Sequence, residues 1–361
     1  MKSVVILFVI WRIFLFVIAL ISPQLLPQFG ARFPYYQGRL IESGLPHFIW
    51  SFGNFDGVHY LGIATNAYEF GYTQAFFPFY PILIKLISQI TQTPVIIAAL
   101  LVSNIAFLLA LLVFYKLISK THNKKIALWS IIFLLTFPTS FYFGAIYTES
   151  LFLLLTLSAF YLYQTNRMVL AWIVGAFASA TRIIGLILSP LLVRKRKDIL
   201  LSLLIVPLGF LAYVFYLKVE FNNPLYFLSS QEVFGQERTT TQIVLLPQVI
   251  FRYLKILLTT GGLPFANAAF ELISTIFALT LLILSYKKIH PRWLVFSLSA
   301  VLLPTLTGTL ASMPRYIIIA FPIYVFLASL NSVKLKIMIV AIFLVLLYVV
   351  TTYFTQGYWV A

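Results

Sequence analysis

Residues 54–81 read NFDGVHYLGIATNAYEFGYTQAFFPFYP and are more polar and more aromatic than the apolar segments around them. The stretch contains Asp56, one of two aspartates in the sequence. The other, Asp198, ends the basic run RKRKD, which is typical of a solvated loop at a membrane surface. A carboxylate beside His59 and Tyr60, on a loop over a membrane, is the first candidate for chemistry. We expect the rest of the chain to be the scaffold that holds this loop.

The composition predicts an all-α polytopic membrane protein. The 361 residues are 61% hydrophobic and only 9% charged, with a mean hydropathy of +1.00, whereas a soluble chain carries about 25% charged residues. Apolar stretches of about 18 or more residues recur along the chain. The net charge of +16 lies mostly in short runs between these stretches, which indicates cytoplasmic loops and not a nucleic-acid interface. We predict one integral unit over residues 1–361, without a soluble domain.

The basic loops assign sides to the predicted spans. Residues 3–25 form the first span, a retained helix and not a signal peptide, because no small-residue cleavage site follows. Residues 26–93 form a long extracytoplasmic loop, and 218–260 form a second outer segment. Every short basic loop then falls on the cytoplasmic side, with about eleven spans in total. This assignment requires 76–92 to be a surface helix, since Lys85 and two prolines make it a poor span.

The other predicted spans follow the same apolar pattern, and the fifth and sixth meet at an interruption, Thr181-Arg182. They cover 94–118, 126–144, 147–164, 168–193, 199–217 and 263–286, then two spans around the outer turn 312–316 and a last one at the C-terminus. With these sides, ionisable residues from five parts of the chain lie at or just beneath the outer face. They are Asp56, His59, Glu69, Glu149, Arg182 and Arg315.

Most of these residues also have a structural explanation. An Asp-Gly pair such as Asp56-Gly57 forms turns, and Glu149 in YTESL fits ordinary capping at a helix start. Arg182, in the apolar context SATRIIG, has no acid beside it and needs an anionic partner such as a lipid phosphate. Arg315, in SMPRY, is placed to bind phosphate or to snorkel towards lipid headgroups.

Metal binding is not predicted, and a bound divalent cation is left as an open alternative. The sequence has no cysteine, and its four histidines are scattered without a two-ligand helical spacing, so we interpret His59 as structural. No pair of acids has clear ligand spacing.

Arg12, within the first span, has no explanation beyond snorkelling or an early helix boundary. The aromatic cluster FFPFYP fits either packing at the membrane interface or a groove for an isoprenoid chain or a sugar.

Four segments resemble one known family. FDGVHYLGIATNAYEFGY followed by AFFPFYPILI is similar to the W-D-x-x-W-Y-x-x-I-A-x-x-G-Y … F-F-P-L-Y-P region of the PIG-V-type mannosyltransferases. FPTSFYFGAIYTESLF, AFASATRIIGLIL and SMPRYIIIAFPIYVFLA resemble later segments of that family, in the same order. Phe55 and His59 replace two tryptophans of the pattern, and Ile183-Ile184 replace a polar pair after Arg182. These departures bear on the acceptor more than on the reaction.

The resemblance implies a type C glycosyltransferase, an integral membrane enzyme that uses polyprenyl-phosphate-linked sugars on the extracytoplasmic face. The expected location is the plasma membrane of a prokaryote or the endoplasmic reticulum. The family's catalytic acid maps onto Asp56, which we predict to be the general base of an inverting transfer of a hexose, with mannose expected, to a lipid or glycan acceptor. Arg182 and Arg315 are predicted to bind the donor phosphate. Further residues are expected to orient the substrates: Glu149, His59, Tyr60, Tyr147 and Tyr316.

Two other classes of function remain open. A transporter or lipid flippase usually shows internal repeats and broken helices that meet at the bilayer midplane. This sequence shows no repeat of fixed period, and its ionisable residues collect at one face. A non-catalytic subunit of a membrane assembly is the third possibility, and it would tolerate replacement of Asp56.

Overall fold

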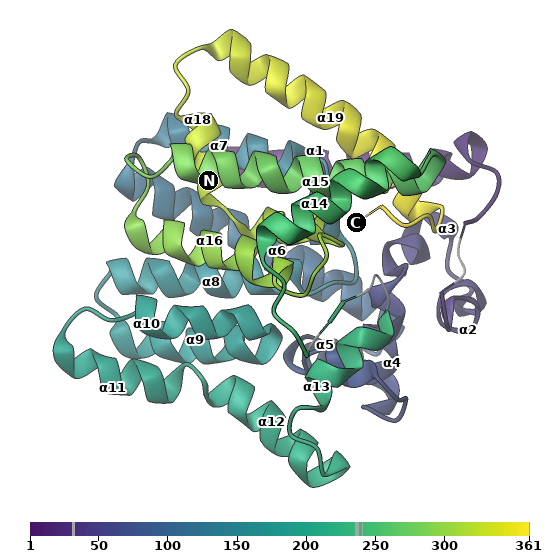
Figure 1. Cartoon of the computed structure of the whole chain (residues 1–361), viewed down its shortest axis with the longest axis horizontal. Coiled ribbons are helices and arrows are strands. Elements are labelled where there is room, and N and C mark those ends of the chain that lie inside the picture. The colour runs from purple at the N-terminus through teal and green to yellow at the C-terminus, as the bar shows by residue number, and fades with distance from the viewer. Residues whose placement is uncertain (31–32, 235–237, 240, 361) are drawn as a thin grey trace.

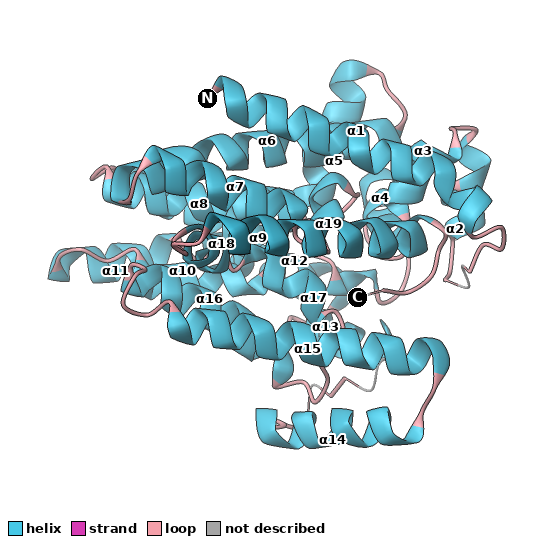
Figure 2. Cartoon of the chain, turned by 90° about the horizontal axis from the view of Figure 1, so that it is seen from above, coloured by secondary structure: helices cyan, strands magenta, loops and turns pink. Residues whose placement is uncertain are grey.

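The chain folds into a bundle of helices joined by loops. The computed structural model describes residues 1–30, 33–234, 238–239 and 241–360, and within these ranges every regular element is helical, without a strand (Figures 1 and 2). The predicted all-α fold is therefore confirmed. Residues 31–32 of the predicted segment 26–93 lie outside the described residues, as do 235–237 and 240 of the predicted segment 218–260.

Five helical segments in the described ranges are long and apolar enough to cross a membrane. They are α1 (Lys2–Leu25), α6 (Val95–Thr121), Arg196–Phe221, α15 (Gly262–Leu284) and α19 (Val333–Thr355). Most of the long helices run side by side along the longest axis of the molecule (Figure 1). The predicted count of about eleven spans is not confirmed, because the remaining helices are shorter than the length of about 20 residues that crosses a bilayer.

Other helices are shorter. They are α7 (Lys124–Thr136), α8 (Glu149–Gln164), α9 (Met168–Thr181), α10 (Leu188–Leu191), α16 (Pro291–Thr305), α17 (Met313–Tyr316) and α18 (Pro322–Ala328). The long segment Arg196–Phe221 consists of α11 (Arg196–Ile205) and α12 (Leu208–Phe221). In the centre α6 packs against α8, α8 against α9, and α9 against α12. Every residue of α18 is buried, and this helix packs against α7.

Local sequence explains where several helices begin. The Asn123 side chain accepts a hydrogen bond from the Ile126 amide (2.8 Å) at the start of α7, and the Ser332 side chain accepts one from the Leu335 amide (3.2 Å) at the start of α19. Both are N-caps, which satisfy amides that the helix leaves without partners. Prolines open or interrupt other helices, because proline cannot donate the bond that a helix interior requires.

Two predicted spans differ from the structure in their bounds, and one predicted interruption is present. The predicted span 126–144 is helical only to Thr136, and a short 3₁₀ helix, η4 (Ser140–Gly144), follows Pro138. The span 199–217 is two helices, α11 and α12, that meet at Pro207. The interruption at Thr181-Arg182 is confirmed, because α9 ends at Thr181 and Arg182 has an extended backbone before η5 (Ile183–Ile187).

Both predicted outer segments contain short helices. The first holds α2 (Tyr36–Arg39), η1 (Ile41–Ser43), α3 (His47–Trp50), η2 (Ser51–Gly53), α4 (Asp56–Asn66), η3 (Thr73–Ala75) and α5 (Phe79–Thr91). The second holds α13 (Tyr226–Ser229), η6 (Ser230–Phe234) and α14 (Leu246–Thr259), and η7 (Ile317–Ile319) follows α17. A helix within 76–92 is thus confirmed as α5, which packs along α6. Helix α14 lies at the edge of the molecule beside α15 (Figure 2).

Candidate active site

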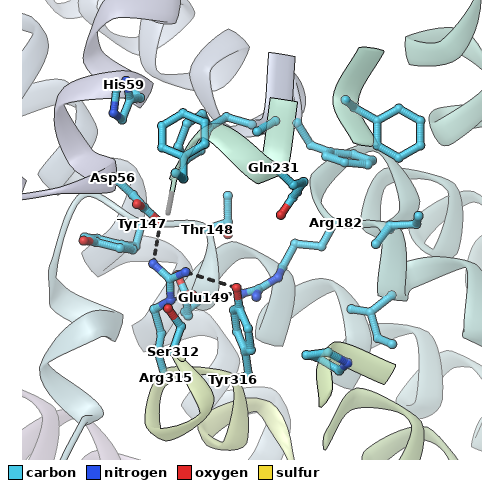
Figure 3. Close-up of a pocket in the computed structure, with 18 of the residues that line it drawn as sticks. Asp56, His59, Tyr147, Thr148, Glu149, Arg182, Gln231, Ser312, Arg315 and Tyr316 are labelled. Atoms are coloured by element: carbon cyan, nitrogen blue, oxygen red, sulfur yellow. Dashed lines mark hydrogen bonds and ion pairs between the residues drawn. The ribbon is translucent and has the colours of Figure 1, made fainter. Parts of the chain in front are cut away.

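One cavity of about 870 Å³ collects most of the predicted site residues. It lies at the end of the bundle where α8 begins and α9 ends, and the outer segments cover it. Its size falls within the range of about 300–1,000 Å³ typical of ligand pockets. In Figure 3 the side chains of Asp56, Glu149, Arg182 and Arg315 point towards one another inside it. These four residues come from α4, α8, the α9–η5 junction and α17.

Asp56 stands at the first position of α4, behind a strained residue. Phe55 has φ 58° and ψ −116°, a backbone conformation that residues with side chains rarely adopt. The neighbouring Asn54 is fixed on both sides: its Nδ2 donates to the Phe354 carbonyl (2.7 Å), and its own carbonyl accepts from the Tyr147 hydroxyl (2.9 Å). These contacts hold the strained turn, which aims the Asp56 carboxylate into the cavity.

Arg315 connects Asp56 to a second acid. Its Nη1 donates to Asp56 Oδ2, and its Nε lies 3.6 Å from Glu149 Oε1. The Arg315 side chain is 8% exposed and that of Asp56 is 21% exposed, so solvent screens the pair weakly. Burial raises the pKa of the Asp56 carboxyl, but the charge and the hydrogen bond of Arg315, with smaller effects of His59 and Arg238, outweigh it. The pKa of Asp56 is lowered as a result.

Glu149 joins the two arginines. Its side chain is 2% exposed, and its Oε1 accepts a hydrogen bond from Arg182 Nη1 at 2.8 Å. Arg182 can reach this position because the chain folds back tightly after α9. A Cβ on Gly185 would lie 2.5 Å from the Ala178 carbonyl carbon, so only glycine fits there. Glu149 Oε2 is buried and accepts no hydrogen bond from any described residue.

Asp56, Arg315, Glu149 and Arg182 therefore form one continuous set of ion pairs, which we call the ionic chain. These residues come from distant parts of the sequence and were expected to meet in one place. The geometry agrees with this expectation. The capping explanation for Glu149 does not agree with the geometry, because its carboxylate turns to the two guanidinium groups. The snorkelling explanation for Arg315 is also wrong, since its side chain is buried against acids.

The tyrosines of the site fall into two groups. Tyr147 is occupied by its bond to the Asn54 carbonyl, and the Tyr60 ring packs edge-on against the rings of Phe76 and Tyr80. Tyr316 instead lies among cations: its hydroxyl is 3.4 Å from Arg315 Nη2, and the Arg182 guanidinium lies 5.2 Å from its ring centroid.

Two ionisable side chains near the ionic chain have pKa values far from their usual range. Burial raises the pKa of Tyr316, but the charges of Arg238, Arg315 and Arg182 outweigh it and lower the pKa to about 8. Burial lowers the pKa of His59 to about 4, against the opposing charge of Asp56. His59 is therefore neutral at pH 7, and its ring stacks on Phe76 with centroids 5.0 Å apart.

One cation of the cavity, Arg238, was not predicted from the sequence as a site residue. Its Nη2 lies 3.4 Å from the hydroxyls of Ser312 and Tyr316, and its Nη1 lies 3.5 Å from Gln231 Oε1. The signal for it was an arginine outside the basic cytoplasmic runs, but position in the sequence does not show that the second outer segment folds over the first. Glu69, which was expected at the outer face, is exposed and accepts a hydrogen bond from Asn66 (2.9 Å), and it does not line the cavity.

Arg12 does not snorkel. It is buried in α1, with its guanidinium 4.0 Å from the Phe16 ring centroid and 4.5 Å from that of Phe52. Gly144 makes room for it, because a Cβ there would lie 2.3 Å from Arg12 Nη1.

The described residues contain no group of three or more His, Asp or Glu side chains that could hold a metal ion.

Comparison with known proteins gives the family. Residues 1–206, more than half of the chain, match the family described as mannosyltransferase (PIG-V). The chain belongs to this family. The resemblance to this family is thereby confirmed, and three of the four sequence segments lie within the matched region, as do Asp56, Glu149 and Arg182. The segment that contains Arg315 lies outside it.

The curated relatives of this PIG-V family member are longer proteins. GPI mannosyltransferase 2 from Cryptococcus neoformans is 33% identical over 159 residues, which cover 41% of this chain and 36% of that protein. GPI mannosyltransferase 2 from Drosophila pseudoobscura is 28% identical over 138 residues, which cover 35% of this chain and 29% of that protein. The chain thus matches about a third of the length of these relatives.

A solved structure is also similar. A crystal structure of the oligosaccharyltransferase from Archaeoglobus fulgidus, tethered to an acceptor peptide, aligns with 96% of this PIG-V family member and 55% of its own chain. The TM-score is 0.45 and the sequence identity 15%.

Proposed function

We propose that this PIG-V family member is a mannosyltransferase that moves mannose from a polyprenyl-phosphate-linked donor to a hydroxyl of a lipid or glycan acceptor. The observation that carries the proposal is the ionic chain, in which two carboxylates and two guanidinium groups line one cavity. Such a cavity offers both groups that the reaction needs, a base for the acceptor and positive charge for the departing phosphate.

In the proposed reaction the Asp56 carboxylate takes the proton of the acceptor hydroxyl. The acceptor oxygen forms a bond to the anomeric carbon of mannose while the bond from that carbon to the phosphate oxygen breaks. The electron pair leaves with the polyprenyl phosphate, whose added negative charge Arg182 and Arg315 compensate. A single displacement inverts the anomeric carbon and needs only one carboxylate, unlike the paired carboxylates of glycosidases.

The geometry adds a step to this scheme. Both arginines are bound to carboxylates in the structure, so a donor phosphate has to compete for them. When the phosphate takes Arg315, Asp56 loses the partner that lowers its pKa. The carboxylate then becomes a stronger base, because a proton acceptor with a higher pKa removes a hydroxyl proton more readily. Donor binding would thus prepare Asp56 to act as the base in the transfer step.

Other parts of the cavity suit the two substrates. Glu149 Oε2 is buried without a hydrogen-bond donor among the described residues, which suits it to accept a bond from a sugar hydroxyl. Apolar side chains also line the cavity, including Ile183, Ile187 and Leu303, and they offer a surface for a prenyl chain. Ile183 is one of the two residues that replace the family's polar pair.

The side of the membrane is inferred from charge. The site lies at the end of the bundle where α8 begins. The short basic runs between α6 and α7, and between α10 and α11, connect helix ends at the other end. Since basic loops stay in the cytoplasm, this arrangement supports an extracytoplasmic site.

The test is mannose transfer from polyprenyl-phosphate-mannose to a panel of lipid and glycan acceptors. Three proteins are compared: the wild type, Asp56→Asn and the control Asp198→Asn. Asp198 is the other aspartate, and it caps α11 by accepting bonds from the amides of Arg194 (3.1 Å) and Lys195 (2.7 Å). We expect transfer by the wild type and the control and none by Asp56→Asn. Equal transfer by all three proteins would exclude Asp56 as the base.

A further inference from the structure

A second cavity, of about 620 Å³, lies behind the wall of the active site. It is enclosed by the end of α4, by α5, by the last turns of α9 and by α12, and it shares no lining residue with the first cavity. Phe77 lines the first cavity and Tyr213 the second, and their ring centroids are 5.1 Å apart. This ring pair forms part of the wall between the two cavities.

The walls of the second cavity are hydrocarbon. Three tyrosines line it. The hydroxyls of two are bonded elsewhere: Tyr68 donates to the Phe76 carbonyl and Tyr213 to the Gln74 carbonyl, each at 2.6 Å. The third, Tyr216, is 36% exposed. Small residues of α9 and α12 line it, among them Ala176, Ala180 and Ala212. At Gly209 the two helices touch so closely that a Cβ on this residue would lie 2.0 Å from the Ala176 carbonyl oxygen.

Lys85 is the charged residue of the lining. Its side chain is exposed and makes no ion pair with any described residue. Around it the surface is apolar: Ile82 is 57% exposed, Phe177 44% and Leu208 55%, and all three line the cavity. In a membrane protein such a surface faces lipid chains, so the cavity opens towards hydrocarbon with one ammonium group at its edge.

This combination selects the occupant by its chemistry. A sugar would find too few hydrogen-bond partners on these walls, and a small soluble anion would bury no apolar surface against them. An amphiphile with a negative headgroup satisfies both parts of the site. We propose that the second cavity binds one anionic phospholipid of the surrounding bilayer, with an acyl chain along the apolar walls and the phosphate beside the Lys85 ammonium.

The bound lipid would support the active site from behind. Its chain would pack against Tyr213, which contacts Phe77 of the first cavity. The adjacent Phe76 stacks on His59, one turn after Asp56 on α4. The lipid site is nevertheless separate from the proposed donor site and does not depend on the proposed transfer reaction.

The test uses the full chain in nanodiscs and needs no enzymatic assay. Two photoactivatable probes with the same diazirine-bearing acyl chain, phosphatidylglycerol and phosphatidylcholine, are crosslinked, and the labelled peptides are mapped. Five proteins are compared. Lys85→Gln removes the amine, and Lys334→Gln is its control at an exposed lysine outside the cavity. Ala212→Trp fills the cavity from an exposed position on α12, and Leu211→Trp is its control on the neighbouring, non-lining residue. The fifth protein is the wild type.

We expect the phosphatidylglycerol probe to label peptides of α5, α9 and α12. Lys85→Gln should reduce this labelling about fivefold, since one lysine near a lipid surface contributes about 1 kcal/mol. Ala212→Trp should abolish labelling of these peptides by both probes, and both controls should match the wild type. Equal labelling by the two probes in the wild type, or unchanged labelling in Ala212→Trp, would overturn the proposal. Loss of the label on adding unlabelled polyprenyl phosphate at equal concentration would overturn it too, by assigning the cavity to the donor.

Discussion

Arg12 and Arg315 are buried to nearly the same degree, with 8% and 7% of their surface exposed, but their surroundings differ in kind. Arg315 lies between two carboxylates and a tyrosine hydroxyl. Arg12 lies between two phenylalanine rings, and no described residue accepts a hydrogen bond from its Nη atoms. An arginine inside a membrane protein is a functional candidate by default, and this pair shows that its partners decide which role it has.

The comparison leads to different expectations for the two residues. Arg315 lies between two carboxylates that would otherwise repel each other, and a substrate phosphate can take their place as its partner. Its loss should therefore affect the reaction. Arg12 packs a span through cation–π contacts, each about 2 kcal/mol when desolvated, so its loss should affect stability.

Arg315→Ala should lower kcat/KM for mannose transfer by about 10²–10³-fold, the size of effect seen when one preorganised electrostatic group is removed. The substitution also leaves Asp56 and Glu149 in one cavity without the cation between them. Arg12→Leu is the matched control, and we expect its kcat/KM to equal that of the wild type. Equal losses in the two variants would remove the distinction between the two arginines.

Arg182→Gln should lower kcat/KM by about tenfold to a hundredfold, because a hydrogen bond to a charged group contributes about 1.5–3 kcal/mol. The effect is smaller than for Arg315, since Arg315 still contacts Glu149 when Arg182 is gone. Steady-state kinetics with varied donor would place most of the loss in KM for the donor. A loss confined to acceptor KM would assign Arg182 to the other substrate.

Transfer should fall as the pH rises through about 8, the pKa of the Tyr316 phenol. Below this pH the phenol is neutral. Above it the phenolate adds a negative charge beside Arg182 and Arg315, and so weakens the site for an anionic donor. The pH–rate profile of Tyr316→Phe should lack this basic limb while the activity at pH 7 stays within about threefold, the loss of one weak hydrogen bond. A limb that persists in Tyr316→Phe would assign it to another group.

Gly144→Ala should destabilise the protein by about 1–3 kcal/mol, the usual cost of overpacking a core. The added methyl would lie 2.3 Å from Arg12 Nη1. In the Arg12→Leu background this penalty should largely disappear, because the guanidinium that meets the methyl is gone. Thermal unfolding of the four proteins of this cycle in one detergent measures the coupling. Additive effects would show that Arg12 does not determine the space at Gly144.

The sequence predicted the helical fold well because its dominant signal is apolar length, which a bilayer requires. It placed most helices within a few residues and located the break at Thr181-Arg182. It failed where proline acts within an apolar run, as at Pro138 and Pro207, since hydropathy does not register a broken helix. It also counted as spans several helices that are too short to cross a bilayer alone.

The site was predicted in part for a different reason. Ionisable residues are so few in this chain that Asp56, Glu149, Arg182 and Arg315 stood out individually. Their pairing was not predictable, because Arg182 has no acid beside it in sequence and finds one 33 positions away. Arg238 was missed because the residues next to it in the sequence do not show that the second outer segment folds over the first. Contacts between remote segments depend on the whole fold and cannot be predicted from any one motif.

The most direct test of the central claim is a structure with a non-transferable analogue of polyprenyl-phosphate-mannose. We expect the phosphate within hydrogen-bond distance of Arg315 and Arg182, with the Asp56 carboxylate released from Arg315 and facing the anomeric carbon from the side opposite the phosphate. A phosphate bound away from both arginines, with the pair between Asp56 and Arg315 intact, would contradict it.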